Sequence, residues 1–137
     1  MVKVLQDLWI LASDSGIVLY SRTFDNNVDV QLFGGLMSAL NSFAEVLSKE
    51  GLTSFELSDK RFAIIKRKNI SIIGNASTKV KEKKLIEELQ IIADKFFVLY
   101  SDILDNWDGD INLFSNFEEK IEDSLEETVD KFKKAFW

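Results

Sequence analysis

Residues 8–24 read LWILASDSGIVLYSRTF, and this stretch decides the fold. Two apolar runs flank the cluster Ser13, Asp14, Ser15 and Gly16, which is typical of a turn and offers a glycine where the backbone needs a positive φ. The stretch therefore predicts a β-hairpin at the start of the chain, and the remaining elements can be placed around it.

An amphipathic helix is expected after the hairpin, from about Val30 to Glu50. Asn27 or Asp29 can cap its first turn, and Gly51 is suited to the position just after its last turn. The hairpin is therefore followed by a helix that must pack on one face of the sheet.

Three more strands are expected after this helix. Residues 52–59 (LTSFELSD) alternate between apolar and polar side chains, which predicts a half-buried or edge strand. Residues 61–69 and 70–77 form a second hairpin with its turn near Lys68 and Asn69. The runs LWILA, FAII and ISII are apolar at consecutive positions, which indicates a sheet that is covered on both faces.

Two further helices complete the chain. The first starts near Lys79, and apolar side chains recur on it every three or four residues. Gly109 interrupts this pattern, and Asn116 is placed to cap a last helix with a similar stripe. The two stripes consist of Leu85, Leu89, Ile92, Phe96, Leu99 and Ile103, and of Phe117, Ile121, Leu125, Val129, Phe132 and Phe136.

The element order is therefore β-β-α-β-β-β-α-α, in one domain that covers residues 1–137. We expect an α/β (α+β) fold with a five-stranded, mostly antiparallel sheet. The first helix should cover one face and the last two helices the other, which makes a three-layer α/β/α sandwich.

The composition excludes several kinds of chemistry. The 137 residues contain no cysteine and no histidine. Disulfides, thiolate or imidazole metal sites and the Ser-His and Cys-His nucleophilic devices are therefore ruled out. We expect no catalytic residue, no cofactor, no metal ion and no enzymatic activity.

The sequence also predicts a cytoplasmic protein. The longest apolar runs, such as Leu8–Ala12, fall far short of the roughly 20 residues that span a bilayer, and no signal peptide precedes them. The net charge of -6 argues against general nucleic-acid binding.

The element order, the hairpin LWILASDSGIVLYSRTF and the helix beginning QLFGGLMSALNSFAEVL resemble a longin domain, which is close in architecture to the roadblock family. A roadblock domain would be expected to start with a helix, so the longin family fits better. The chain looks similar to stand-alone longin proteins of archaea, and a SNARE-type coiled-coil segment is not expected.

The resemblance implies a function as well as a fold. Longin-like domains pair with one another as platforms in trafficking complexes and small-GTPase exchange assemblies. A homodimer, or a heterodimer with another longin or roadblock-like protein, is thus expected, with a small GTPase as a further partner. Such a complex would place the chain peripherally at membranes.

The first helix carries the candidate interface. At 100° per residue, its leucines and Phe43 gather on one side, which should face the sheet. The opposite side is small and almost uncharged through three turns, whereas an exposed face usually carries charges. With the following strand it gives the candidate contacts Gly34, Gly35, Ser38, Asn41, Ser42, Phe55 and Leu57.

The two glycines of that helix have a second interpretation. A glycine inside a helix usually has a packing or functional reason. Gly35 lies at the border of the apolar side, where it could relieve crowding against a strand or loop, and Gly34 could simply be tolerated. Partner contact and internal packing therefore both remain open.

Basic residues form a second candidate surface. Residues 60–84 hold nine lysines and arginines, whereas residues 102–130 hold eleven acids and only Lys120. We expect the turn of the second hairpin and the start of the next helix to share one basic end, which could contact an acidic partner or, weakly, an anionic membrane. A solvated rim is the alternative. The patch comprises Lys66, Arg67, Lys68, Lys79, Lys81, Lys83 and Lys84.

Two other segments attract attention. Asp105, Asp108 and Asp110 surround Gly109, but the spacing fails the EF-hand pattern, so we interpret them as solvated acids in a turn. The segment KFKKAFW (131–137) combines lysines with aromatic residues, which suits the last turn of a helix or the tip of a membrane contact.

The sequence therefore predicts a non-enzymatic interaction module. The alternative is a small-molecule sensory module of similar sheet-and-helix architecture. An enclosed pocket with convergent polar groups would distinguish the second from the first. The large apolar residues in the strands favour a solid core.

Overall fold

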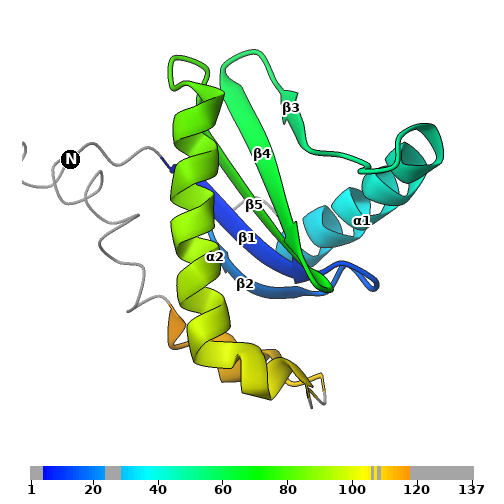
Figure 1. Ribbon diagram of the computed structural model, residues 1–137, viewed down its shortest axis with the longest axis vertical. Helices are drawn as coiled ribbons and strands as arrows, with labels where there is room; N and C mark the ends of the chain where they lie inside the picture. The colour runs from blue at the N-terminus through cyan, green and yellow to red at the C-terminus, as the bar shows by residue number, and fades with distance from the viewer. Residues whose placement is uncertain (1–4, 24–28, 106, 108, 118–137) are drawn as a thin grey trace, which may run out of the picture.

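The computed structural model describes residues 5–23, 29–105, 107 and 109–117 (Figure 1). Its elements follow the order β1, β2, α1, β3, β4, β5, α2 and η1, the last being one turn of 3-10 helix. They span Asp7–Ala12, Val18–Arg22, Val30–Leu47, Ser54–Glu56, Lys60–Arg67, Ile70–Ser77, Glu82–Asp105 and Ile111–Phe114.

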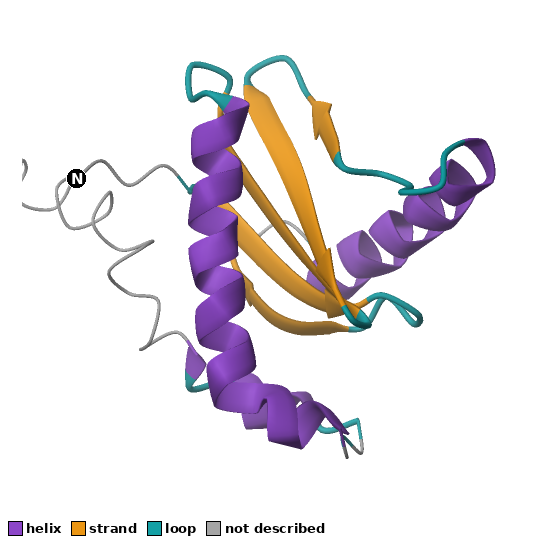
Figure 2. Ribbon diagram, viewed as in Figure 1, coloured by secondary structure: helices purple, strands orange, loops and turns teal. Residues whose placement is uncertain are grey.

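The five strands form one sheet in the order β2-β1-β5-β4-β3 (Figure 2). Every neighbouring pair is antiparallel. β1 and β5 are central, and their register runs from Asp7 opposite Asn75 to Ala12 opposite Ile70. The turn between β1 and β2 contains Gly16 at φ 76°, as the turn cluster predicted.

One face of the sheet is covered by α2, which lies along it (Figure 1). The helix turns its predicted apolar stripe inward except for Leu99, which is exposed. η1 and Phe117 close the same core against Tyr20 of β2. Burial raises the pKa of the Tyr100 hydroxyl in this cluster, so the group is held in its neutral form. The side chains of α2 that are buried here include Leu85, Leu89, Ile92, Phe96 and Tyr100.

The other face of the sheet carries α1 and a smaller core. Trp9 lies at its centre and stacks on Phe33 of α1 and on Phe62 of β4, with ring centroids 4.1 and 6.1 Å apart. Phe55 of β3 continues the series with a centroid 4.4 Å from Phe62. A row of aromatic rings therefore connects α1 to the edge strand.

The layered arrangement and the five-stranded antiparallel sheet confirm the predicted fold class. Asp29 is the N-cap of α1, since its carboxylate accepts a hydrogen bond from the Leu32 N–H at 3.1 Å. The helix ends at Leu47, before the predicted Glu50, and the strand within 52–59 is only three residues long. The predicted last helix lies outside the described residues beyond Phe117.

Candidate interaction surface

The inward side of α1 is the side with small and polar residues. Gly34 and Met37 are its two buried residues. A Cβ atom on Gly34 would overlap the carbonyl oxygen of Gly16 and lie 2.6 Å from Val18 Cγ2. The absence of a side chain at Gly34 therefore allows the helix backbone to approach the β1–β2 hairpin closely.

Polar side chains on the same side hold α1 in place. The Gln31 amide accepts from the N–H of Val18 at 3.0 Å and donates to its carbonyl at 3.1 Å. Ser38 Oγ donates to the Ser13 carbonyl at 3.0 Å. Neutral hydrogen bonds of this kind contribute about 1 kcal/mol each, and they act together with the packing of Phe33 and Met37 to hold the helix on the sheet.

Asn41 secures the C-terminal half of the helix. Its Oδ1 accepts from the Leu52 N–H at 3.1 Å and from the ammonium group of Lys66. Lys66 Nζ also donates to the carbonyl of Glu50 at 2.7 Å. One lysine of β4 thus anchors both α1 and the loop that follows it.

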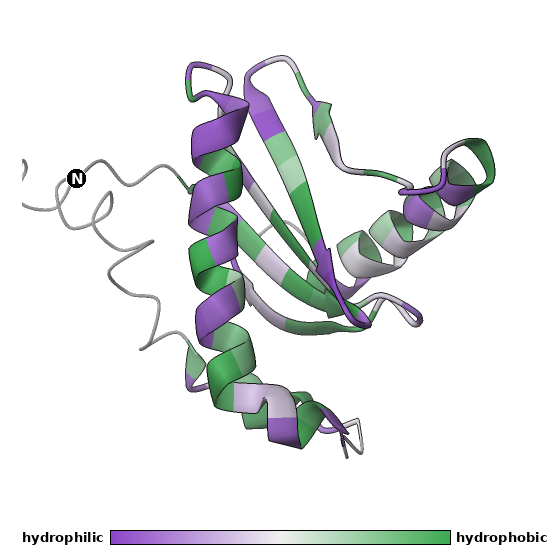
Figure 3. Ribbon diagram, viewed as in Figure 1, coloured by the Kyte–Doolittle hydropathy of each residue, from purple (hydrophilic) through white to green (hydrophobic). Residues whose placement is uncertain are grey.

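The outward side of α1 is apolar. We call it the apolar face of α1, and its side chains are between 44 and 82% exposed. Hydrophobic residues follow the helix out to its C-terminal end (Figure 3). A helix in a monomeric soluble protein normally turns such a stripe toward its own core. This face consists of Leu32, Leu36, Leu40, Phe43, Val46 and Leu47.

The orientation predicted for α1 is therefore wrong. Gly34, Ser38 and Asn41 do not form an exposed contact surface, because they contact other parts of the same chain. Gly34 and Ser38 contact the β1–β2 hairpin, and Asn41 contacts β4 and the loop before β3. Gly35 and Ser42 are exposed, and a Cβ on Gly35 would meet nothing within 4 Å. The close approach of Gly34 and the polar attachments determine which side of the helix faces the sheet.

The edge strand β3 holds the two other predicted contact residues. Phe55 is half-buried in the aromatic row, and Leu57 is exposed just beyond the strand. β3 pairs only with β4 among the described residues, so its outer edge presents free backbone groups. Such an edge is a ready template for pairing with another chain.

The predicted basic patch is divided between two ends of the sheet. β5 carries the chain across the sheet between the β4–β5 turn and the start of α2. Arg67 at the turn pairs with Asp94, with 2.6 Å between the charged atoms, and Lys68 lies over the Phe97 ring. The second group lies near the N-terminus of α2 and comprises Lys79, Lys81, Lys83 and Lys84.

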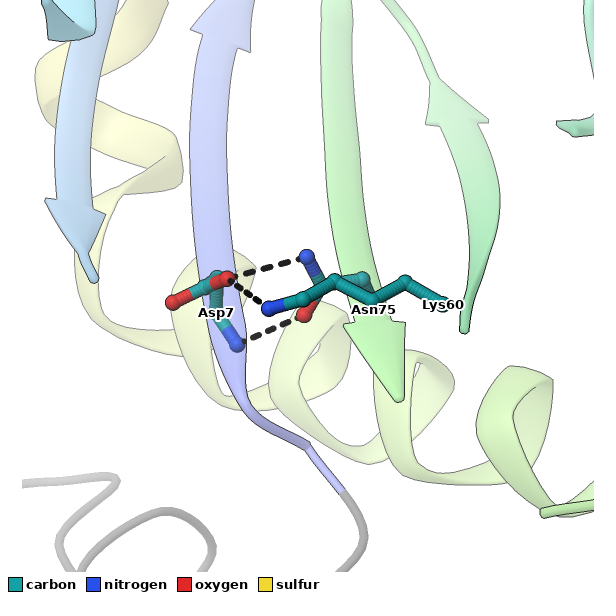
Figure 4. Close-up of polar contacts among 3 residues, drawn as sticks. All are labelled: Asp7, Lys60 and Asn75. Carbon is teal, nitrogen blue, oxygen red and sulfur yellow. Dashed lines mark hydrogen bonds and ion pairs between the residues drawn. The ribbon is translucent and has the colours of Figure 1, made fainter. Parts of the chain in front are cut away.

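A buried polar cluster was missed in the sequence (Figure 4). The Asp7 N–H donates to Asn75 Oδ1 and the Asn75 amide donates to Asp7 Oδ2, both at 2.9 Å. Lys60 Nζ lies 3.7 Å from the same carboxylate oxygen. The cluster connects β1, β5 and β4 and fixes their register. Its signal was the presence of polar residues in otherwise apolar strands.

The space between α1 and the sheet does not accommodate a ligand. Met37, Ser38, Asn41 and their neighbours on β1, β4 and β5 enclose only about 10 Å³, which is at the lower limit for one water molecule. An enclosed pocket with convergent polar groups, which would favour a sensory module, is therefore lacking between α1 and the sheet.

The acidic turn after α2 does not form a metal site in the described part of the chain. No group of three or more Asp or Glu residues there could hold an ion. The Asp110 carboxylate instead accepts from the Asn112 N–H at 2.9 Å and caps η1. Asp108 lies outside the described residues.

By length and composition, α1 also meets the test for a helix that could cross a membrane, with a mean hydropathy of 1.2 over 18 residues. Among the described residues it is the one helix that does. Its apolar residues are interspersed with glycines and polar residues, so no long uninterrupted apolar run marks it in the sequence. A single such helix is weak evidence for a membrane span.

No protein-family model matches the sequence, and no curated protein sequence matches it. Several solved structures do resemble this chain in fold. MglB of Myxococcus xanthus is 10% identical with a TM-score of 0.57, over 72% of this chain and 78% of that one. A roadblock/LC7 domain from Streptomyces avermitilis is 16% identical with a TM-score of 0.55, over 68% and 82%. At these identities the likeness concerns architecture, and the chain has the roadblock and longin fold.

Proposed function

We propose that this chain is a non-enzymatic interaction module that pairs with a second copy of itself through the apolar face of α1. The observation that carries the proposal is that all six large side chains of this face point away from the chain's own sheet. Fully burying a leucine or phenylalanine stabilises by about 1.5–3 kcal/mol. Several such side chains together can offset the entropy lost on association.

A second copy suits this face because the face is complementary to itself. Two apolar stripes brought together by a two-fold axis bury the same residues on both chains. Gly35 and Ala39 adjoin the stripe and are exposed, so two helices could approach each other closely there. The open edge of β3 and Leu57 offer further contacts beside the main one.

The resemblance to longin domains supports an extension of this proposal. A pair of such domains would present a surface to a small GTPase or to a trafficking-type complex. As a stand-alone protein of the archaeal longin type it would act in the cytoplasm, and it would reach membranes through that complex. A related longin or roadblock-like domain could replace the second copy. The mechanism would be docking and positioning.

The test replaces Leu36 and Phe43 with glutamate in the full chain. We expect the double variant to sediment as a folded monomer under conditions where the wild type is a dimer, because each glutamate would place a charge in the interface. The matched control replaces Ile91 and Val98, two exposed residues on the outer side of α2, with glutamate.

The control variant should keep the wild-type mass. Retention of the dimer by the Leu36 and Phe43 variant, or its loss in the control, would overturn the proposal. Binding of α1 to lipid vesicles without a change of mass would identify a membrane as the occupant instead.

The GTPase extension is tested separately, with a small GTPase of the same organism loaded with GDP or a non-hydrolysable GTP analogue. We expect the dimer to bind one of the two forms. Binding of neither form would contradict the extension but leave the pairing of α1 standing.

A further inference from the structure

A pocket of about 330 Å³ lies at the end of the sheet that holds the β1–β2 and β4–β5 turns. It forms where the β1–β2 turn, the β4–β5 turn and the C-terminal end of α2 meet. Its apolar wall includes Phe97, Leu104 and Trp107, and its charged residues are Asp14, Asp105 and Lys68. The volume falls in the usual range for ligand pockets.

The wall of this pocket is fixed by contacts within the chain. The Ser13 N–H donates to the Asn69 carbonyl at 2.8 Å, which ties the two turns together. Trp107 Nε1 donates to the Asp110 carbonyl at 3.0 Å, and its ring meets that of Phe114 edge to face at 6.0 Å. The polar atom of the indole is therefore satisfied, and its ring is held in position at the pocket.

The pocket has an excess of acidic residues, because Lys68 is the one basic residue among those that line it. Asp14, Asp102 and Asp105 are exposed, and none has an ion-pair partner among the described residues. Two of them lie in the last turn of α2, which contains no basic residue. A helix C-terminus carries a partial negative charge and is stabilised by cations. This end of the molecule therefore favours an added positive charge.

The chain itself contains a segment of the required chemistry. Residues 131–137, KFKKAFW, combine three lysines with Phe132, Phe136 and Trp137. Phe117, the last described residue, is buried against Phe96 and Tyr100 on α2. The 13 residues between Phe117 and Lys131 span about 20 Å as the helix that the sequence predicts and about 40 Å when fully extended. Both exceed the roughly 18 Å length of the C-terminal half of α2.

We propose that the segment 131–137 docks in this pocket of its own chain. An aromatic side chain of the segment would pack on Trp107, Phe97 and Leu104, and its lysines would pair with Asp14 and Asp105. The proposal does not depend on the pairing of α1, because the two surfaces share no residue.

The experiment uses the full chain, which contains no cysteine. A nitroxide attached through A135C broadens the NMR signals of nearby protons in an isotope-labelled sample. We expect the amides of Ser15 and Asn69 and the indole N–H of Trp107 to lose most of their intensity. The amide of Lys81, at the opposite end of the sheet, should keep its intensity.

The charged part of the proposal is tested by D14N combined with D105N, which should restore most of the lost intensity. The matched control combines D59N with E87Q, two exposed acids far from the pocket, and should leave the broadening unchanged. Raising the salt concentration should act like the first variant, because exposed charges are screened.

Three results would overturn the proposal. The first is undiminished signals at Ser15, Asn69 and Trp107. The second is broadening in a labelled chain without the cysteine when an unlabelled, spin-labelled chain is added, which would mean that the segment binds another copy. The third is binding of the segment to anionic vesicles with no effect at the pocket, which would identify a lipid surface.

Discussion

The two long helices of this protein have similar amphipathic sequences, but they turn opposite sides toward the sheet. α2 buries its apolar side, whereas α1 exposes it. α2 buries a continuous set of large apolar side chains against the sheet, namely Leu85, Leu89, Ile92, Phe96 and Tyr100. α1 packs with Phe33, Gly34, Met37 and polar side chains and leaves the six large residues of its apolar face exposed. The first arrangement completes the core of one chain, whereas the second leaves an apolar surface without a partner in that chain.

This difference separates the energetic roles of the two helices. The apolar residues of α2 contribute to folding at any protein concentration, since their contacts lie within the chain. Those of α1 can contribute only when a second molecule covers them, because stabilisation by binding depends on concentration. Substitutions of the same kind on the two helices should therefore have different effects.

The largest effect is expected for Leu89→Ala on α2. Leu89 is fully buried, and one of its methyl groups fills the space that a Cβ on Gly74 would need. The substitution should lower the free energy of unfolding by about 2–5 kcal/mol, measured by urea denaturation, with the same loss at low and high protein concentration.

The matched change Leu36→Ala on α1 should behave differently. In dilute solution it should alter the free energy of unfolding by less than about 0.5 kcal/mol, and a larger loss should appear only where the wild type is a dimer. Equal losses for both substitutions in dilute solution would contradict the comparison, because Leu36 would then belong to the core of the single chain.

A smaller effect is expected from the two adjacent glycines. Gly34→Ala should destabilise by about 1–3 kcal/mol, since the added methyl group would press on the backbone of the β1–β2 turn. Gly35→Ala should stabilise by about 0.4–1 kcal/mol, because its site is open and alanine is the better helix former. Thermal unfolding of the two variants measures this contrast.

The opposite outcome for the two glycine variants would support the orientation of α1 that the sequence predicts. A neutral Gly34→Ala together with a destabilising Gly35→Ala would mean that α1 is rotated, with its leucines against the sheet. The pair thus tests the position of α1 without any reference to a partner.

Much of the fold could be predicted from local signals. The turn clusters, the stripe of α2 and the consecutive apolar residues of β1, β4 and β5 predicted the element order, the sheet and its two covered faces. Each of these features depends on residues that are close together in the sequence. The short length of β3 and the early end of α1 are boundary details that tertiary contacts decide.

The orientation of α1 could not be read in the same way. The usual rule that apolar residues face inward gave the wrong side, because it assumes that the single chain supplies every apolar contact. The contact of Gly34 with Gly16 depends on residues 18 positions apart, which periodicity does not reveal. The unusual pair of glycines did indicate a close contact, and in the structure Gly34 makes that contact with the chain's own β1–β2 hairpin.

The basic patch illustrates a different kind of error. Lys68 and Lys81 are close in sequence, but β5 has eight residues and carries the chain about 26 Å between them. The antiparallel hairpin already predicted from the sequence implied this separation. The Asp7 and Asn75 cluster, by contrast, required knowledge of which strands pair.

The mass of the wild-type chain as a function of concentration tests the central claim most directly. Sedimentation equilibrium should give a value that rises with concentration from 15.7 kDa toward twice that mass, as the apolar faces of α1 cover each other. A mass that stays at 15.7 kDa up to the highest soluble concentration would contradict the claim.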